Sequence, residues 1–318
     1  MEYKKRLTYI LSLIGALAVI YLASFIFDPE IMGTRNASYV WLDSKLAGRT
    51  ARIVIGKEGD KSSSVEIVKK NSKWFVLHNG TEYPARQLRV EDFIGIFTAR
   101  KAWPVRSTSA SSHEKLGIGN NAAARITLYG ENSTLADLLL GSEDVIGREI
   151  YIRKYGQNEV RSGENLFAAY ISGPVTGWYN LKLIPESEDG KVAVDSVQRL
   201  SVYAPQSTQV FSRKNRTWNI SGFEISNPDQ ASIDSYVREV LNLEGDDFSD
   251  SIAADDPKFN YASLVLELGN GGVKTIRITE ADESGRRFAR VEGSDFVYSL
   301  APWAAQRLFR NAKDFEKQ

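Results

Sequence analysis

The sequence predicts an α+β protein in which an N-terminal transmembrane helix precedes two tandem, duplicated domains rich in antiparallel sheet, each with a covering helix. Three observations lead to this prediction. An uncharged run extends from Leu7 to Phe27. Short β-branched or aromatic runs, separated by polar turns, fill much of the remaining chain. Some of them recur later, as in the equivalent surroundings of Trp74 and Trp218, which are 144 positions apart.

The uncharged run is long enough to cross a membrane. Its 21 residues, 7–27, reach about 30 Å as a helix, which matches the hydrocarbon core of a bilayer. Basic residues 4–6 precede it, and Asp28 and Glu30 follow it. The positive-inside rule therefore predicts a cytoplasmic tail, 1–6, and an extracytoplasmic remainder. We expect a single-pass membrane protein with its N-terminus in the cytoplasm.

A cleaved signal peptide is the alternative to a retained anchor. The apolar run is longer than the 7 to 15 residues typical of a signal peptide, and it ends in Phe25, Ile26 and Phe27 rather than in small residues. These features favour a retained anchor. The chain has no cysteine, which excludes disulfides, thiolate nucleophiles and a lipid anchor on an N-terminal cysteine.

The composition predicts a folded exterior. Hydrophobic residues make up 42% of the chain and aromatic residues 11%, which is enough to build cores. Lys plus Arg and Asp plus Glu both number 40, so no net charge attracts nucleic acid. Residues 28–51 form the predicted juxtamembrane segment. Its Tyr39, Trp41 and Leu42 lie either at the lipid surface or against the first domain.

Three pairs of segments indicate the duplication: 72–76 and 216–220, 124–130 and 263–269, and 147–153 and 285–291. The third pair is offset by 138 positions. Their common order predicts a first repeat at 52–184 and a second at 196–318. The acidic segment between them, 185–195, is the predicted linker.

Within the first repeat, short apolar runs predict strands at 52–55, 65–68, 73–77, 124–129, 135–140 and 149–153. A helix is expected between Arg86 and Lys101, with Leu88, Phe93, Ile94 and Phe97 on one face. Another short helical segment is expected at 166–172.

The second repeat has a matching pattern. Its strands are expected at 264–268, 273–278 and 288–291. A helix that begins after the capping candidates Asn227 and Asp229 carries five apolar residues at helical spacing: Ile233, Tyr236, Val237, Val240 and Leu241. Residues 301–309 are expected to end the repeat as a helix.

No pattern in the chain assigns catalytic, cofactor-binding or metal-binding residues. His78 and His113 lie in different predicted elements. Ser112 and Lys115 match the Ser-x-x-Lys spacing but lack its companion motifs. The acidic stretch 244–256 lacks the ligand spacing of an EF-hand. The sequence therefore predicts a protein that is not an enzyme and holds no cofactor.

Tryptophans near the ends of the two repeats were a further possibility for binding. Trp178 and Trp303 could form an aromatic platform for sugars, although core or domain-junction packing is the default interpretation for such residues.

Several short motifs resemble a known family. They are Lys73-Trp74, the segment 114–118 (EKLGI), 138–141 (LLLG), 151–153 (YIR) and 178–181 (WYNL). Together with the N-terminal anchor, they resemble the bacterial family catalogued as domain of unknown function 4340. The second repeat has no good match to EKLGI or LLLG. The resemblance implies an envelope protein found beside ABC-type export systems related to gliding-motility transporters, and it carries no functional residues. With the predicted anchor, it implies a location in the bacterial inner (cytoplasmic) membrane.

These observations lead to two expectations about function. The first is a membrane-anchored accessory or interaction module that partners a polytopic transporter permease or another envelope protein. The alternative is an envelope carbohydrate-binding or hydrolytic domain with a carboxylate site that no motif reveals.

Overall fold

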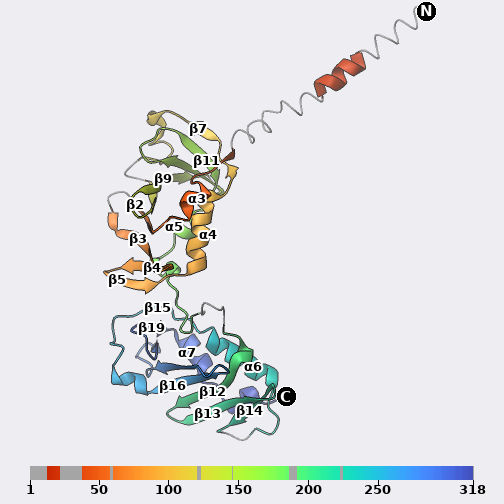
Figure 1. Ribbon diagram of the computed structural model, residues 1–318, viewed down its shortest axis with the longest axis vertical. Helices are drawn as coiled ribbons and strands as arrows, with labels where there is room; N and C mark the ends of the chain where they lie inside the picture. Colours follow the sequence, from red (N-terminus) through yellow and green to blue (C-terminus); the bar gives the residue numbers. More distant parts are fainter. Residues whose placement is uncertain are drawn as a thin grey trace, which may run out of the picture. The chain divides into compact units, whose positions relative to one another are not determined.

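The computed structural model describes residues 13–21, 38–57, 60–119, 123–144, 146–185, 192–222 and 225–317 (Figure 1). The chain divides into two compact units, Met1–Trp178 and Tyr179–Gln318. The division precedes the predicted linker 185–195, of which residues 186–191 lie outside the described part. Each unit combines antiparallel sheet with helices, so the predicted α+β class is confirmed.

Only part of the predicted membrane anchor is described. Residues 13–21 form a helix with exposed side chains, whereas 7–12 and 22–27 lie outside the described residues, as do the predicted tail 1–6 and residues 28–37. Among the helices of the described ranges, none has both the length and the apolar character needed to cross a bilayer.

The first unit is built on one antiparallel sheet with the strand order β5-β4-β3-β2-β8-β9-β10-β11-β7. Its strands are β2 (Arg52–Lys57), β3 (Asp60–Lys70), β4 (Lys73–His78), β5 (Thr81–Pro84), β7 (Val105–Ser107), β8 (Ala124–Tyr129), β9 (Thr134–Glu143), β10 (Glu149–Lys154) and β11 (Val160–Glu164). A tight turn at Asn71 and Ser72, both with positive φ, joins β3 to β4.

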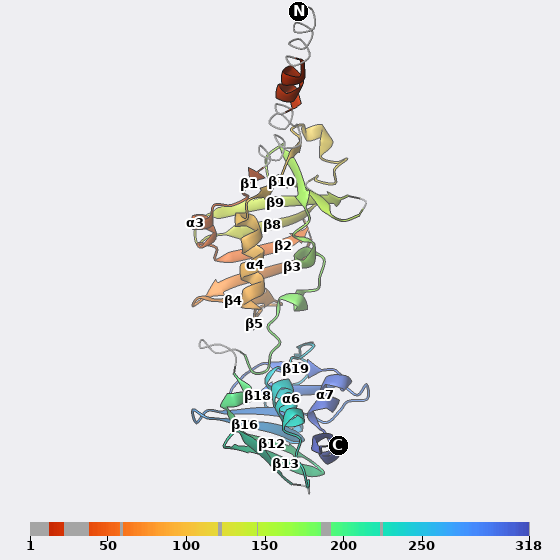
Figure 2. The same ribbon diagram turned by 90° about the vertical axis from the view of Figure 1, so that its right-hand side faces the viewer.

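Helix α4 (Gln87–Thr98) covers one face of this sheet (Figure 2). It buries Val90, Phe93 and Phe97, whose spacing places them on one side of the helix. The expectation that Leu88 belongs to this face is wrong, because Leu88 is 72% exposed. Leu88 lies five positions before Phe93, which turns its side chain about 140° away around the helix axis.

The juxtamembrane aromatic residues pack onto the first unit. Strand β1 (Ser38–Tyr39) pairs with β6 (Lys101–Ala102), and helix α3 (Ser44–Ala47) follows. Trp41 and Leu42 are both buried. The rings of Trp41 and Trp103 pack edge to face, with 5.4 Å between their centres. Of the two positions expected for these residues, the lipid surface and the first domain, the structure places Trp41 and Leu42 against the first domain.

Short helices complete the first unit. These are η1 (Ala110–Ser112), α5 (Ala168–Ile171) and η2 (Val175–Trp178). Trp178 ends the unit in its core, where its ring lies 5.4 Å from that of Phe93. Its carbonyl oxygen accepts a hydrogen bond from the backbone N–H of Arg86, which caps the start of α4.

The second unit has an antiparallel sheet with the strand order β14-β13-β12-β16-β17-β18-β19-β15. Its strands are β12 (Val197–Ala204), β13 (Ser207–Lys214), β14 (Thr217–Ser221), β15 (Asp247–Phe248), β16 (Ala262–Leu268), β17 (Val273–Ile278), β18 (Arg287–Val291) and β19 (Val297–Leu300). Its helices are η3 (Val194–Ser196), α6 (Gln230–Leu241), η4 (Pro257–Asn260), α7 (Pro302–Leu308) and η5 (Ala312–Phe315).

Helix α6 covers one face of the second sheet and buries all five apolar residues expected on its face (Figure 2). The Asp229 side chain caps the helix by accepting a hydrogen bond from the N–H of Ala231 at 3.2 Å. A hydrogen bond from the Ser232 hydroxyl is the main cause that lowers the pKa of Asp229 below its ordinary value.

The two sheets share one arrangement of strands. Apart from β5, which has no counterpart in the second sheet, each strand of the first matches one strand of the second in the same order. The pairing also sets the equivalence of residues: Arg153 pairs with Leu139 and Val160, whereas Arg290 pairs with Arg277 and Val297. Arg153 therefore corresponds to Arg290.

This register corrects the offset of 138 that the sequence indicates for segments 147–153 and 285–291. Between β10 and β18 the offset is one residue smaller, since Arg153 corresponds to Arg290. The cause is a register shift between Ile150 and Ile152, where β10 pairs irregularly with β9.

Candidate functional site

The connection from β7 to β8 crosses the face of the first sheet that α4 does not cover. Leu139 points to this face, because its neighbours in β9 point to the helix side. It is fully buried there in a cluster with Ile118, Ala123 and Val160. Ile118 belongs to residues 108–119, which we call the 108–119 loop. The cluster fixes the end of this loop against the sheet.

Two glycines allow the loop to approach the sheet closely. A Cβ atom on Gly141 of β9 would lie 2.6 Å from the carbonyl oxygen of Leu116. Gly117 has a φ of 62°, and a Cβ there would lie 2.3 Å from Oγ of Ser142. The approach allows the N–H of Ser142 to donate to the Leu116 carbonyl oxygen at 3.0 Å. A side chain at either glycine would push the loop away from β9.

Arg153 joins the loop to the turn between β10 and β11. Its Nε donates to the carbonyl oxygen of Ile118 at 2.9 Å, and its Nη1 donates to that of Gln157 at 3.0 Å. The residue is only 5% exposed. Burial lowers the pKa of the guanidinium from its ordinary value, and the nearby Tyr155 phenol partly offsets this.

A pocket of about 460 Å³ opens between the two segments that Arg153 joins. It is lined by Ala110, His113, Glu114, Gly119, Arg153, Tyr155, Gly156 and Asn158. Nε2 of His113 lies 3.1 Å from the carbonyl oxygen of Asn158, so the two walls meet there. The Glu114 carboxylate lies close to Gly119, where a Cβ would be 2.3 Å from its Oε1. The lining therefore offers a carboxylate, an imidazole, an amide, a phenol and a guanidinium.

Tyr155 is held in place by residues of β8 and β9. The guanidinium carbon of Arg125 lies 3.8 Å from the centre of the Tyr155 ring, and the Tyr155 N–H donates to the Asp137 carbonyl oxygen at 2.9 Å. The Asp137 carboxylate in turn fixes Arg125 through two hydrogen bonds, from Nε at 2.9 Å and from Nη2 at 2.7 Å. Thr127 donates a further hydrogen bond to Asp137 at 3.3 Å. Tyr155 is 40% exposed, and its ring is nevertheless fixed by the contact with Arg125, which Asp137 holds in place.

Three of the five motifs that carry the family resemblance meet at this place. Segment 114–118 belongs to the 108–119 loop, 138–141 lies in the strand that the loop contacts, and Arg153, which bonds the loop, ends the motif 151–153. In agreement, the family profile "Domain of unknown function (DUF4340)" matches residues 74–262, which is more than half of the chain. The chain belongs to this family. No curated protein matches the sequence. The part matched to the family contains the whole pocket and extends into the second unit.

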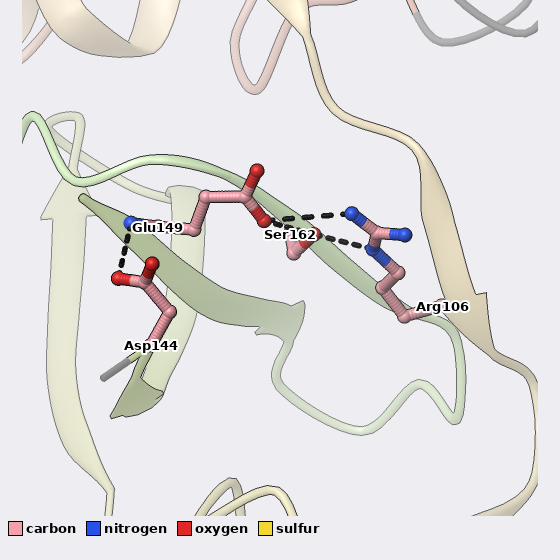
Figure 3. Close-up of polar contacts among 4 residues, drawn as sticks. All are labelled: Arg106, Asp144, Glu149 and Ser162. Carbon is pink, nitrogen blue, oxygen red and sulfur yellow. Dashed lines mark hydrogen bonds and ion pairs between the residues drawn. The ribbon is translucent and has the colours of Figure 1, made fainter. Parts of the chain in front are cut away.

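A second group of polar residues in this family member lies beside the loop (Figure 3). Arg106 of β7 donates from Nε to the hydroxyl of Ser162 at 2.7 Å, and its Nη2 lies 3.4 Å from Glu149 Oε2. The Ser162 hydroxyl donates to the same Glu149 oxygen at 3.3 Å, and Asp144 accepts from the N–H of Glu149 at 2.9 Å. This network ties β7 to β10 and β11, and so fixes the strand from which the loop begins.

The Ser-x-x-Lys pair noted in the sequence lies in the same loop. The Ser112 hydroxyl donates to the Ser109 carbonyl oxygen at 2.7 Å and to Ser107 Oγ at 2.8 Å, which stabilises the turn at η1. His78, at the end of β4, pairs with Thr81 across a hairpin. Of the two histidines, the structure places only His113 at the pocket.

The acidic stretch 244–256 has structural contacts. The Asp246 N–H donates to the Ser299 carbonyl oxygen, and Asp247 forms β15 beside β19. Across the described ranges, no three His, Asp or Glu side chains gather in a way that could hold a metal ion.

Of the two tryptophans considered as sugar platforms, Trp178 is buried in the core. Trp303 of α7 is 61% exposed, with the Arg307 guanidinium 5.3 Å from its ring.

Sequence reasoning missed the pocket residues Glu114, Arg153 and Tyr155, and it missed Arg125 and Asp137, which support Tyr155. One signal was available in the sequence. Arg125, Asp137 and Arg153 are charged residues inside strands whose other members are mostly apolar, and such residues need partners.

Proposed function

We propose that this protein is an extracytoplasmic accessory module of the bacterial envelope, anchored by residues 7–27 in the inner membrane. In this proposal it acts by binding, not by catalysis. Its partner is a polytopic permease of an ABC-type transport system.

The observation that carries the anchor is the exposure of the described helix 13–21. Six large apolar side chains on it are each more than half exposed: Leu13, Ile14, Leu17, Val19, Ile20 and Tyr21. They surround the helix, and a helix that is apolar all round is typical of burial in protein or lipid. The basic residues 4–6 support a cytoplasmic position of the N-terminus.

We further propose that the two units arose by duplication, with repeats at 52–184 and 196–318. The shared strand order supports this, as do the equal surroundings of Trp74 and Trp218. Only the first unit has the loop pinned by Gly117 and Gly141. We propose this loop as the surface that contacts the partner, because it carries the family motif 114–118, to which the second repeat has no good match.

The anchor is tested by extraction of membranes with alkaline carbonate. The unaltered chain is expected to stay in the membrane pellet. A variant with Leu13→Ser, Leu17→Ser and Ile20→Ser is expected to move to the supernatant, whereas a triple serine variant at the exposed residues Leu88, Val105 and Val273 is expected to stay in the pellet. Release of the unaltered chain would contradict the anchor.

The partner is tested by photo-crosslinking in living cells. In one variant a photoreactive residue replaces Lys115 in the loop. In the control variant the same residue replaces Lys274, which is exposed on β17. We expect Lys115 to give a product that mass spectrometry identifies as an ABC permease, and Lys274 to give none. If neither position captures a permease, the proposed partner is wrong. If only Lys274 does so, the loop is not the contact surface.

A further inference from the structure

We propose that the pocket beside the 108–119 loop is a saccharide-binding site in which a sugar ring stacks on Tyr155. This inference goes beyond the proposed transporter partnership and does not depend on it. It rests on the geometry of the pocket, on the chemistry of its lining and on a comparison with the second unit.

The support of Tyr155 is the first part of the argument. Sugar rings present apolar C–H faces that pack against aromatic side chains, and an aromatic ring that is held rigidly loses little entropy on binding. Arg125 covers one side of the ring, and Asp137 fixes Arg125 with two hydrogen bonds. The part of Tyr155 that is exposed to the pocket is therefore positioned before any ligand arrives.

The polar groups opposite the ring suit hydroxyls. Glu114 accepts hydrogen bonds, and Asn158 carries an amide that both donates and accepts. His113 uses Nε2 to donate to the Asn158 carbonyl oxygen, which leaves Nδ1 as the ring nitrogen that can contact a ligand. A mixed set of donors and acceptors matches a sugar hydroxyl, which also does both. The volume of about 460 Å³ lies within the range of about 300 to 1,000 Å³ that is typical of ligand sites.

Arg153 acts as a positioning residue. By donating to the Ile118 carbonyl on one wall and to the Gln157 carbonyl on the other, it sets the width of the pocket. The ligand-binding groups on the two walls thereby keep a defined separation, as expected for a site that is largely formed in advance.

The second unit shows that the fold does not require these residues. At the positions of Arg125, Asp137 and Tyr155, its sheet has Ser263, Thr275 and Glu292. The equivalence of the last pair is supported by matching hydrogen bonds, because the Tyr155 N–H donates to the Asp137 carbonyl and the Glu292 N–H to the Thr275 carbonyl. The second sheet thus has the same strand order without an equivalent of the supported ring, which is consistent with a role of Tyr155 in binding.

The test is a binding measurement on the full chain in a detergent without a sugar headgroup, because glycosidic detergents would compete for the site. The probes are cellobiose, N,N′-diacetylchitobiose and digalacturonate, which differ in their neutral, acetamido and carboxylate groups. Saturation-transfer difference NMR detects weak binding to a large particle, and calorimetry gives the dissociation constant. We expect at least one probe to bind.

The decisive variant is Tyr155→Ala, and its matched control is Tyr203→Ala, which removes a tyrosine of similar exposure from the second unit, at 43% against 40%. We expect Tyr155→Ala to weaken binding about ten-fold and Tyr203→Ala to leave it unchanged. Tyr155→Phe, which keeps the ring, is expected to retain most of the affinity.

Three outcomes would overturn the proposal. They are no binding by any of the three probes, equal loss in the two alanine variants, or unchanged affinity in a Tyr155→Ala protein with native circular dichroism. Because none of these measurements involves a transporter, they are independent of the crosslinking test above.

Discussion

The side-chain amide of Gln87 binds the backbone of Trp74 through both its oxygen and its nitrogen. Its Oε1 accepts from the Trp74 N–H at 2.8 Å, and its Nε2 donates to the Trp74 carbonyl oxygen at 3.0 Å. Gln230 does the same for Trp218, at 2.7 and 3.1 Å. In each unit the first residue of the covering helix is thus bonded to a strand of the sheet. These bonds fix where the helix begins relative to the strand.

We predict that Gln87→Leu destabilises the first unit by about 1–3 kcal/mol, because it leaves the N–H of a buried tryptophan without its acceptor. Gln230→Leu should have a similar effect on the second unit. Hydrogen exchange is the suitable measurement, since unfolding of a two-unit chain need not follow one transition. Gln87→Leu should raise exchange in β4 and α4.

The control for both variants is Gln306→Leu, at an exposed position of α7. It should leave exchange unchanged. Equal exchange in Gln87→Leu and the unaltered chain would show that the two hydrogen bonds between Gln87 and Trp74 contribute nothing measurable to the stability of the first unit.

The amount of fold that could be predicted from the sequence depended on local patterns. Strand alternation and the 233, 236, 237, 240 and 241 spacing report directly which side of an element is buried, so the α+β class and the face of α6 were predicted correctly. Leu88 was assigned to the wrong face because one apolar residue in the first turn was given the same weight as a regular spacing. In α4 the spacing is carried by Val90, Phe93 and Phe97.

The pocket could not be predicted because it forms only where the 108–119 loop meets the turn between β10 and β11, and because the support of its Tyr155 depends on the pairing of strands. Arg125 and Asp137 come from β8 and β9, and their contact depends on the register of these two strands. A slip of one residue reverses the face of every side chain in a strand. The irregular pairing at Ile150 and Ile152 is such a shift, and no short-range signal in the sequence marks it.

Two buried tyrosines should make the second unit sensitive to alkali. Burial raises the pKa of Tyr298 to about 12 and also raises that of Tyr236, where Arg310 opposes and Glu239 adds to the shift. In the unfolded chain a tyrosine ionises near pH 10. Between about pH 10 and 12 the folded state therefore keeps protons that the unfolded state releases, and the free energy of unfolding falls as the pH rises.

Urea denaturation at pH 9 and pH 11 measures this loss when the transition of the second unit is followed by itself, for example through a fluorescent label placed in that unit. Tyr298→Phe should make the difference in unfolding free energy between the two pH values smaller, whereas Tyr203→Phe, at an exposed position, should not. The same difference in Tyr298→Phe and the unaltered chain would contradict the assignment. Tyr236→Phe should in addition cost about 1–2 kcal/mol at pH 9, because it removes the hydroxyl that donates to the Leu308 carbonyl at 2.6 Å.

The close approach at Gly141 predicts a local effect of adding one methyl group. Gly141→Ala places a Cβ against the Leu116 carbonyl, so the loop must move or the strand must shift, at a cost of about 1–3 kcal/mol. Gly95→Ala is the matched control, because Gly95 lies in α4 with open space around its Cβ direction. In a helix this control should be neutral or stabilising by up to about 1 kcal/mol.

Limited digestion with trypsin detects the movement, since Lys115 lies in the loop. Gly141→Ala should be cut after Lys115 faster than the unaltered chain, and Gly95→Ala should be cut at the same rate. Equal rates in all three proteins would show that the loop is not held by this contact.

Arg153 and Arg290 occupy equivalent register positions, which allows the role of Arg153 to be tested with one substitution at two places. Lysine has one ammonium group and lacks the fork with which Arg153 reaches two carbonyls on different segments. Arg153→Lys should therefore release the loop and the β10–β11 turn together, with faster hydrogen exchange at 116–119 and 155–158. At Arg290 the Nε is buried and lacks a hydrogen-bond partner among the described residues, so Arg290→Lys breaks no bond from that atom. Its effect should be confined to the packing against Phe259, whose ring lies 5.6 Å from the guanidinium. If Arg153→Lys changes exchange in only one of its two segments, the residue supports that segment and does not set the width of the pocket.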